Sequence, residues 1–196
     1  MSETPIKPID VTTWSLEMLD PAELRPSAKP GERLQVVHAE VPSPELSRYL
    51  YTAVGGDWFW YDRLPWTYER WQEVVTQVGH ETWMLLDRGT PAGHFVLQGD
   101  GEGTVELVYF GLIPGFIGKG YGGYLLTEAI RAGWSLGDRW EAFPQTTRVW
   151  VHTCSLDGQP AALNNYQARG FTVFKTETKS ENAPETTPGP WPGARG

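Results

Sequence analysis

The sequence has little of three features that would mark other classes of protein. Cys154 is the single cysteine, so we expect neither a disulfide framework nor a metal site, and we expect a reducing, cytoplasmic location. No apolar run reaches the ~20 residues of a membrane-spanning helix, and the N-terminus does not resemble a signal peptide. No run of lysine and arginine stands out, and the net charge is -8. Nucleic acid and membranes are therefore not expected as partners.

Length and composition indicate one domain that can bury a sizeable core in 196 residues. Residues 1–33 contain five prolines and no sustained periodicity, so we predict an N-terminal arm that could pack through Trp14, Leu16 and Leu19. Residues 181–196 have little apolar content, and we predict a disordered C-terminal tail there. The predicted domain spans residues 34–180.

A glycine-rich stretch is the most informative feature of the chain. Residues 112–124 read LIPGFIGKGYGGY. The apolar run 105–113 predicts a buried strand, and the amphipathic run 124–134 predicts a helix. Backbone N–H groups in such a turn are free at the positive end of the helix dipole, and glycine has no Cβ to keep an anion away. The stretch therefore predicts a phosphate site.

Periodicity and capping residues predict the elements around this stretch. Strands are expected at 34–41, 82–87, 93–98, 105–113, 148–154 and 171–176, and helices at 44–54, 67–78, 122–137 and 160–169. The second and third strands should form a hairpin. The order is one strand, two helices, three strands, and then helix, strand, helix and strand. It predicts an α/β (α+β) domain in which helices cover both faces of a mixed sheet.

The glycine-rich stretch resembles the pyrophosphate loop of the GNAT superfamily of acetyl-CoA-dependent N-acetyltransferases. The family pattern is a strand, a proline, and then arginine or glutamine followed by x-x-Gly-x-Gly or Ala. Pro114 stands in the proline place, and Gly120 and Gly122 match the two small residues. Ile117 stands where arginine or glutamine is usual. An anion contact at that position would therefore have to come from the backbone.

A second stretch, NNYQARGF at residues 164–171, is similar to the family's late helix, which ends in Tyr-x-x-x-Gly-Phe. Tyr166 matches the tyrosine and Gly170 the glycine, while the asparagine expected near the helix start would fall at about Gln159. The two motifs stand in the family's order. The resemblance implies a GNAT-like, mostly antiparallel central sheet. It also implies an N-acetyltransferase that moves an acetyl group from acetyl-CoA to a primary amine by direct attack in a ternary complex.

The resemblance also implies where the cosubstrate would bind. Backbone N–H groups of the glycine loop would hold the pyrophosphate, with Lys119 as a point charge. N–H groups at the splayed end of the fourth strand would polarise the thioester carbonyl. The expected acetyl-CoA-binding residues are Gly111, Leu112, Ile113, Ile117, Gly118, Lys119, Gly120, Tyr121, Gly122, Gly123 and Asn165.

Three residues are candidates for moving protons. Tyr166 matches the position at which many family members carry the general acid that protonates the CoA thiolate; the alternative is a packed aromatic residue. Glu106 lies in an otherwise apolar strand, where a carboxylate should be paired, hydrated or functional and where burial would raise its pKa. His152, on the next strand, can titrate near neutrality. We favour Glu106 as the base over His152, with Asp57, another group or no dedicated base as further alternatives.

An aromatic segment at residues 57–66 lies in the region that borders the acceptor site in the family. Asp57, Trp58 and Trp60 would suit an amine on an apolar body through charge and cation–π contacts, or the rings would form a hydrophobic cluster. For Trp66 and Trp71 we favour packing. The expected partner is a small-molecule or peptide amine, and a homodimer is left open.

Two other functions stay open on the sequence. Gly118, Gly120 and Gly123 also satisfy Gly-x-Gly-x-x-Gly, and Asp157 follows the next strand, which would suit a dinucleotide-binding oxidoreductase. Three strands precede this loop, whereas that fold opens on a βαβ unit. A non-catalytic acyl-CoA-binding regulatory module would keep the fold without transfer. Cys154 could carry an acyl group, but nothing beside it marks an activated thiol.

Overall fold

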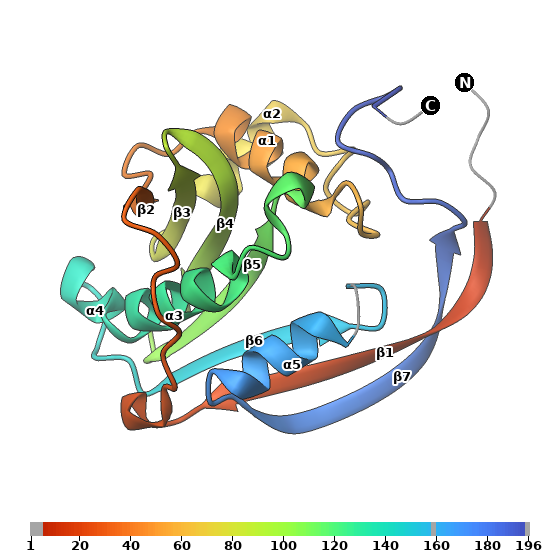
Figure 1. Ribbon diagram of the computed structural model, residues 1–196. Coiled ribbons are helices and arrows are strands. Elements are labelled where there is room, and N and C mark those ends of the chain that lie inside the picture. The colour runs from red at the N-terminus through yellow and green to blue at the C-terminus, as the bar shows by residue number, and fades with distance from the viewer. Residues whose placement is uncertain (1–5, 158–159, 195–196) are drawn as a thin grey trace.

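The computed structural model describes residues 6–157 and 160–194. In this part of the chain a seven-stranded sheet has the order β2-β3-β4-β5-β6-β1-β7, with helices on both faces (Figure 1). All neighbouring strands are antiparallel except β5 and β6, which are parallel. The predicted mixed, mostly antiparallel α+β fold is confirmed. The strands are β1 (Ile6–Met18), β2 (Leu34–His38), β3 (His80–Asp87), β4 (Thr90–Gly99), β5 (Thr104–Leu112), β6 (Arg148–Cys154) and β7 (Thr172–Pro184).

Five α-helices and two short 3-10 turns connect the described strands. They are η1 (Pro21–Glu23), α1 (Pro44–Gly55), α2 (Tyr68–Val75), η2 (Pro114–Phe116), α3 (Tyr121–Trp134), α4 (Leu136–Arg139) and α5 (Ala161–Ala168). No helix in these described ranges is both long and apolar enough to cross a membrane.

The capping residues read from the sequence fix where α1 and α2 begin. The Ser43 side chain accepts a hydrogen bond from the Leu46 N–H (3.1 Å), and the Thr67 side chain accepts one from the Arg70 N–H (3.3 Å). Such caps satisfy N–H groups that a helix start leaves without partners. Both helices therefore begin where they were predicted to begin.

The core lies between the sheet and α3. Leu125, Leu126 and Ile130 of α3 are fully buried, as are Leu97 of β4 and Leu16 of β1. The opposite face of the sheet carries α1 and α2 (Figure 1). The two faces thus have different coverings, with a large apolar core on the α3 side and an aromatic layer on the α1 side.

The first strand differs from the N-terminal arm that was expected. Ile6–Met18 form β1, which lies inside the sheet between β6 and β7. Leu16 is fully buried, whereas Leu19, which was expected to pack, is 59% exposed. The pairing with β7 is irregular between Ser15 and Leu16, so the buried positions change from odd numbers, such as Val11, to even ones. That shift breaks the period-two pattern by which a strand is recognised.

The C-terminal segment also differs from the predicted disordered tail. Residues 181–184 belong to β7, which pairs with β1 along almost its whole length. Beyond the strand, the Gly189 N–H donates to the Gly56 carbonyl (2.8 Å) and the Tyr61 hydroxyl donates to the Thr186 carbonyl. Most of these contacts are backbone hydrogen bonds. They hold in place a polar segment whose low apolar content had led us to predict disorder.

The feature that positions the functional site is a splay between β5 and β6. The two strands pair only from Thr104↔Arg148 to Leu107↔Val151. Next to this point β5 contains a bulge, because Val96 pairs with Tyr109 while Leu97 pairs with Leu107. A bulge bends its strand and increases the local twist. Beyond it, β5 and β6 diverge toward the start of α3 (Figure 1).

Candidate acetyl-CoA site

The start of α3 is an open glycine turn. Gly118 and Gly120 have φ of +82° and +78°, a left-handed conformation that glycine adopts without strain. Gly120 is the N-cap of α3 and makes no side-chain capping bond, so the first-turn N–H groups are available to a ligand. Nothing lies within 4 Å of a Cβ built at Gly118. The turn therefore combines free donors with open space, as an anion site requires.

An arginine from another element lies against this helix start. A Cβ built at Gly123 would be 2.7 Å from Arg169 Nη1 and 2.9 Å from Ser27 Oγ, so Gly123 makes room for these side chains. Arg169 Nε is buried without a hydrogen-bond partner among the described residues. A cation at the positive end of a helix is unfavourable unless an anion joins it. Arg169 was quoted in the late-helix motif but was not recognised as a site residue.

Two of the predicted backbone donors are already used. The Ile113 N–H donates to the Ala92 carbonyl (2.9 Å), and the Ile117 N–H donates to the Pro114 carbonyl (3.2 Å). These two N–H groups are therefore not free to donate to acetyl-CoA, and a contact of either residue with the cosubstrate stays a prediction. The Ile117 side chain is 51% exposed and has no donor to offer.

The free donors of the splay follow from the alternation along β5. Successive N–H groups of a strand point to alternate sides. The N–H groups of Ile113 and Gly111 therefore point toward β4, and those of Phe110 and Leu112 point toward the side on which β5 has no partner strand. The Leu112 N–H is thus free among the predicted donors, and so is that of Phe110, which was not predicted. Gly111 has another function, because a Cβ there would lie 2.4 Å from Val54 Cγ1. Its missing side chain lets α1 pack on β5.

Three more of the residues predicted to bind the cosubstrate are Asn165, Tyr121 and Lys119, and their side chains make different contacts. The Asn165 side chain donates to the Gly122 carbonyl (3.3 Å) and ties α5 to α3. The Tyr121 hydroxyl instead donates to Asp87 (3.0 Å), so its side chain points toward the β3–β4 turn. Lys119 Nζ lies 4.7 Å from the centre of the Phe116 ring. Gln159, the expected asparagine position, lies outside the described residues.

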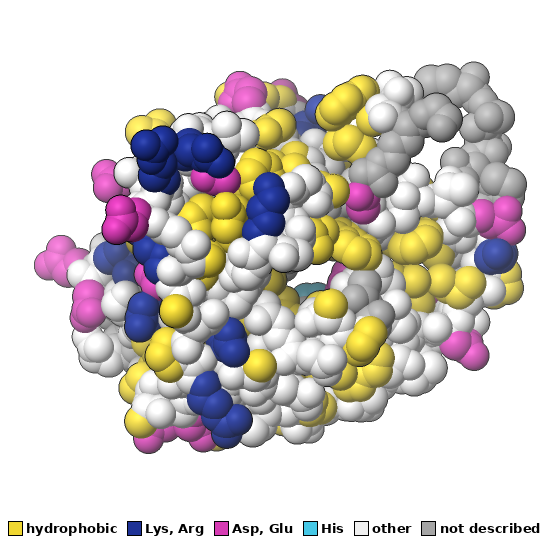
Figure 2. Space-filling model, viewed as in Figure 1, with side chains coloured by type: hydrophobic (Ala, Val, Ile, Leu, Met, Phe, Trp, Pro, Cys, Tyr) yellow, Lys and Arg dark blue, Asp and Glu magenta, His cyan; other side chains and the backbone are white. Residues whose placement is uncertain are grey.

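Tyr166 is the side chain that α5 brings to the splay. Its ring is buried between Phe110 of β5 and Phe171, with centroid distances of 5.9 and 6.0 Å. Burial, together with the negative charge of Asp157, raises the pKa of the Tyr166 hydroxyl far above its usual value. The phenol thus keeps its proton at neutral pH. Figure 2 shows the surface hollowed between the start of α3 and α5, with a histidine side chain at the bottom.

Glu106 and His152, which the sequence presented as competing bases, form one pair. His152 Nδ1 lies 3.4 Å from Glu106 Oε1, and their side chains are 50% and 27% exposed. The hydrogen bond that the imidazole donates to Glu106 raises the pKa of His152 above its usual value, although desolvation opposes this. Glu106 follows the buried Val105 and precedes the buried Leu107, so its side chain lies on the sheet face opposite α3. The lone carboxylate in the strand therefore has a partner.

The aromatic segment after α1 is largely a packed cluster. The Trp60 ring contacts Tyr51 and Tyr109 at 5.3 and 5.2 Å, and its N–H donates to Asp157 (3.4 Å). Trp66 and Trp71 pack together at 5.0 Å, as favoured from the sequence. Asp57 and Trp58 are half-buried in the turn between α1 and α2.

Two further observations bear on the alternatives. Asp157, the acid that a dinucleotide site would need, accepts hydrogen bonds from Thr153 and from the Cys154 N–H. Burial, with Asp157 nearby, raises the pKa of the Cys154 thiol to about 12, so this cysteine is not an activated nucleophile. Within the described residues no group of three or more His, Cys, Asp or Glu could hold a metal ion.

Comparisons with known proteins agree with this arrangement. The fold is similar to those of a GCN5-related N-acetyltransferase from Kribbella flavida (15% identity, TM-score 0.60, 92% of this chain and 60% of that one) and of another from Sphaerobacter thermophilus (18%, 0.59, 94% and 56%). The chain thus spans less than two thirds of these two proteins. No curated protein matches it by sequence. A sequence profile of the acetyltransferase (GNAT) family matches residues 45–171, more than half of the chain, and the protein belongs to that family.

Proposed function

We propose that this chain transfers the acetyl group of acetyl-CoA to a primary amine by direct attack within a ternary complex. The observation that carries the proposal is the splay between β5 and β6. The open start of α3 lies at its wide end, and the Glu106–His152 pair lies where the strands meet. Members of the family typically use acetyl-CoA. That cosubstrate supplies an acyl group activated as a thioester.

The residues around the start of α3 fit a phosphate-bearing cosubstrate. The first-turn N–H groups of Gly122 and Gly123 can donate to phosphate oxygens, and the space in front of Gly118 is open. The Arg169 guanidinium against Gly123 supplies the charged side chain that Ile117 does not. The unpartnered, buried Nε of Arg169 supports this assignment. The N–H groups of Phe110 and Leu112 can bind the acyl carbonyl along the β5 edge.

Two features of the splay support a route for the protons of this reaction. The Glu106–His152 pair can accept the proton that the attacking amine loses, directly or through water. The raised pKa of Tyr166 keeps a proton on its hydroxyl, which can be donated to the leaving sulfur. The raised pKa of Cys154 argues against an acyl-enzyme route. These facts together favour one-step transfer to the amine over transfer through the protein.

Steady-state kinetics with acetyl-CoA and a panel of primary amines test the proposal. We expect release of CoA to depend on the amine and to match acetylated amine one to one. Initial-rate plots should intersect, because both substrates bind before a product leaves. Parallel lines, or an acetyl group left on the protein when amine is omitted, would contradict direct attack. Absence of transfer to every amine tested, with acetyl-CoA bound, would favour the non-catalytic acyl-CoA-binding alternative.

A further inference from the structure

A half-buried arginine lies on the α1 side of the sheet without a partner. The guanidinium of Arg63 lies 4.4 Å from the centre of the Trp66 ring and 4.7 Å from that of Tyr109. The Arg63 backbone N–H donates to the Tyr51 hydroxyl (3.4 Å), but the guanidinium makes no hydrogen bond or ion pair within residues 6–157 and 160–194. Desolvation lowers the pKa of Arg63, while Tyr51, Asp62 and Glu106 act in the opposite direction. Cation–π contacts with the two rings stabilise the guanidinium, but they leave its N–H donors unpaired and partly desolvated, so the position suits an anion.

Arg63 borders a narrow cavity with three polar atoms that lack partners. His94 Nδ1, Trp71 Nε1 and the Tyr109 hydroxyl are buried there, and none has a hydrogen-bond partner among the described residues. His94 is 2% exposed, and desolvation lowers its pKa to about 3, so the ring stays neutral. Each of the three groups can donate a hydrogen bond. A native protein rarely leaves such groups unsatisfied, which indicates that a polar ligand or water completes them.

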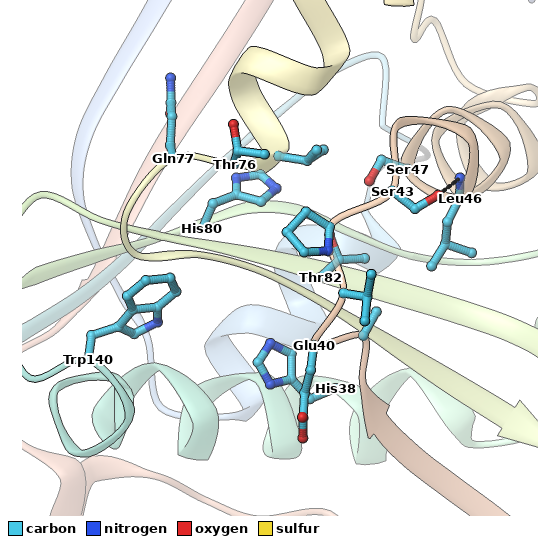
Figure 3. A pocket seen from close by; sticks show the side chains of 14 residues that line it. His38, Glu40, Ser43, Leu46, Ser47, Thr76, Gln77, His80, Thr82 and Trp140 are labelled. Atoms are coloured by element: carbon cyan, nitrogen blue, oxygen red, sulfur yellow. Dashed lines mark hydrogen bonds between the residues drawn. The ribbon is translucent and has the colours of Figure 1, made fainter.

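The residues that line this cavity include one cationic side chain, which suits an anion with a single negative charge. Arg63 is the one Lys or Arg among its lining residues, which are Ser47, Arg63, Trp71, Val74, Val75, His80, Thr82, His94, Val96 and Tyr109. An adjoining pocket shares Ser47 and His80 with it, and Figure 3 shows the His80 ring and Ser47 lining that pocket. The adjoining pocket has no Lys or Arg and contains Glu40. The anion should therefore bind at Arg63, and a carboxylate matches one planar guanidinium.

Arg63 also lies on the side of the sheet from which the amine would attack the thioester. The Glu106 carboxylate, which faces the same side of the sheet, acts to raise the pKa of Arg63, and the charge of Arg63 acts to lower the pKa of His152. Asp62, next to it in sequence, is exposed. A molecule held by Arg63 would therefore lie close to the Glu106–His152 pair.

We propose that Arg63 binds the carboxylate of an acceptor that carries both an amine and a carboxylate, as an amino acid does. The inference rests on the proposed function, because it takes the Glu106–His152 pair to receive the amine. Trp71, His94 and Tyr109 donate to water, since the cavity between them has a volume of about 10 Å³, which suits one water. The rings of Trp66 and Tyr109 pack against the guanidinium and fix its position.

The test compares the binding of amino acids with that of their carboxamides, phenylalanine and phenylalaninamide first, to protein loaded with CoA. The wild-type protein should bind the acid at least about 10-fold more tightly. Arg63→Met should weaken binding of the acid about 10- to 100-fold and that of the amide less than about 3-fold. Arg70→Met is the matched control, because Arg70 also lies over the Trp66 ring (5.3 Å) but is exposed and paired with Glu73. It should change neither affinity.

Equal affinity of the wild-type protein for acid and amide would overturn the proposal, as would equal weakening of both ligands by Arg63→Met. If Arg63→Met lowers the melting temperature, Arg63→Lys keeps the charge and should still weaken the acid selectively. Binding does not require turnover. Failure of acetyl transfer to any amine would therefore refute the proposed function, while the ratio of acid to amide affinity would still decide the role of Arg63.

Discussion

At the scale of single residues, the contact between Glu106 and His152 is the feature on which the proposed proton transfer depends. Neither group acts alone, because the carboxylate stabilises the imidazolium 3.4 Å away. Replacing Glu106 therefore changes the titration of His152. A loss of activity on substituting either residue would not by itself identify the base, and the pKa of His152 has to be measured directly.

Glu106→Gln should lower the pKa of His152, because it removes the first cause of its elevation. The pKa of His152 is raised in the folded protein, so the pair stabilises the fold fully below the unfolded pKa of about 6.5, and this contribution is lost as pH rises through the folded value. NMR titration of the imidazole resonances measures the shift. Glu45→Gln, which removes a remote charge at the start of α1, is the control. An unchanged His152 pKa in Glu106→Gln would show that the two groups are not coupled.

Tyr166→Phe should lower kcat about 10²-fold while KM for acetyl-CoA changes little. The substitution removes only a hydroxyl that makes no hydrogen bond with another described residue, and the ring keeps its packing against Phe110 and Phe171. The melting temperature should therefore stay close to that of the wild-type protein. Full activity in this variant would move the proton donor to solvent or to another group.

At the scale of elements, β1 is the strand on which the second half of the sheet depends. It pairs with both β6 and β7, and β7 has no other neighbour in the described sheet. The segment that follows β1 crosses α3, where the Ser27 N–H donates to Thr127 Oγ1 (2.9 Å). The N-terminal residues are thus part of the structure that holds the site.

Leu16→Ala should lower the free energy of unfolding by about 2–5 kcal/mol, because the side chain is fully buried in the core. Leu19→Ala, just beyond the strand and 59% exposed, should change it by less than about 0.5 kcal/mol. Urea unfolding followed by circular dichroism measures both. Equal, small effects would show that the N-terminal segment is an arm after all.

The sequence predicted elements with their own signal and missed those that depend on distant partners. Arg148–Cys154 and the start of α1 were predicted at the observed residues, because apolar periodicity and a capping serine are local. The second half of β7 was missed, since its side chains are exposed and its hydrogen bonds to β1 leave no apolar pattern. β1 was missed because its bulge changes the buried face.

The same distinction explains which site residues were found. The glycine loop and Tyr166 belong to compact motifs, so sequence was sufficient to locate them. The pairing of Glu106 with His152 needs the register of two strands, which sequence does not fix. Arg63 and Arg169 were visible in the chain, but their importance lies in what surrounds them. The N–H groups of Ile113 and Ile117 already have partners, one across the strand pair and one in a 3-10 turn, and neither bond could be read from the sequence.

At the scale of the whole molecule, the splay divides the sheet into two parts. β2 to β5 carry α1 and α2, whereas β6, β1 and β7 lie next to α5, and β5 meets β6 over only a short stretch. A cosubstrate in the splay would touch the start of α3, the free edge of β5 and Tyr166 of α5. It would therefore join the two parts, and acetyl-CoA should raise the melting temperature whereas NAD should not.

Calorimetric titration of acetyl-CoA into two variants of Gly122 tests the central claim most directly. A Cβ at this position has ordinary contacts at 3.8 Å and no positive φ, so Gly122→Ala should keep the fold, gain about 1 kcal/mol of helix stability and bind like the wild-type protein. Gly122→Glu should also fold, because a carboxylate suits a helix start. The account predicts that Gly122→Glu loses at least about 100-fold in affinity, because its charge repels phosphate. Equal affinity of the two folded variants would contradict an acetyl-CoA site at the start of α3.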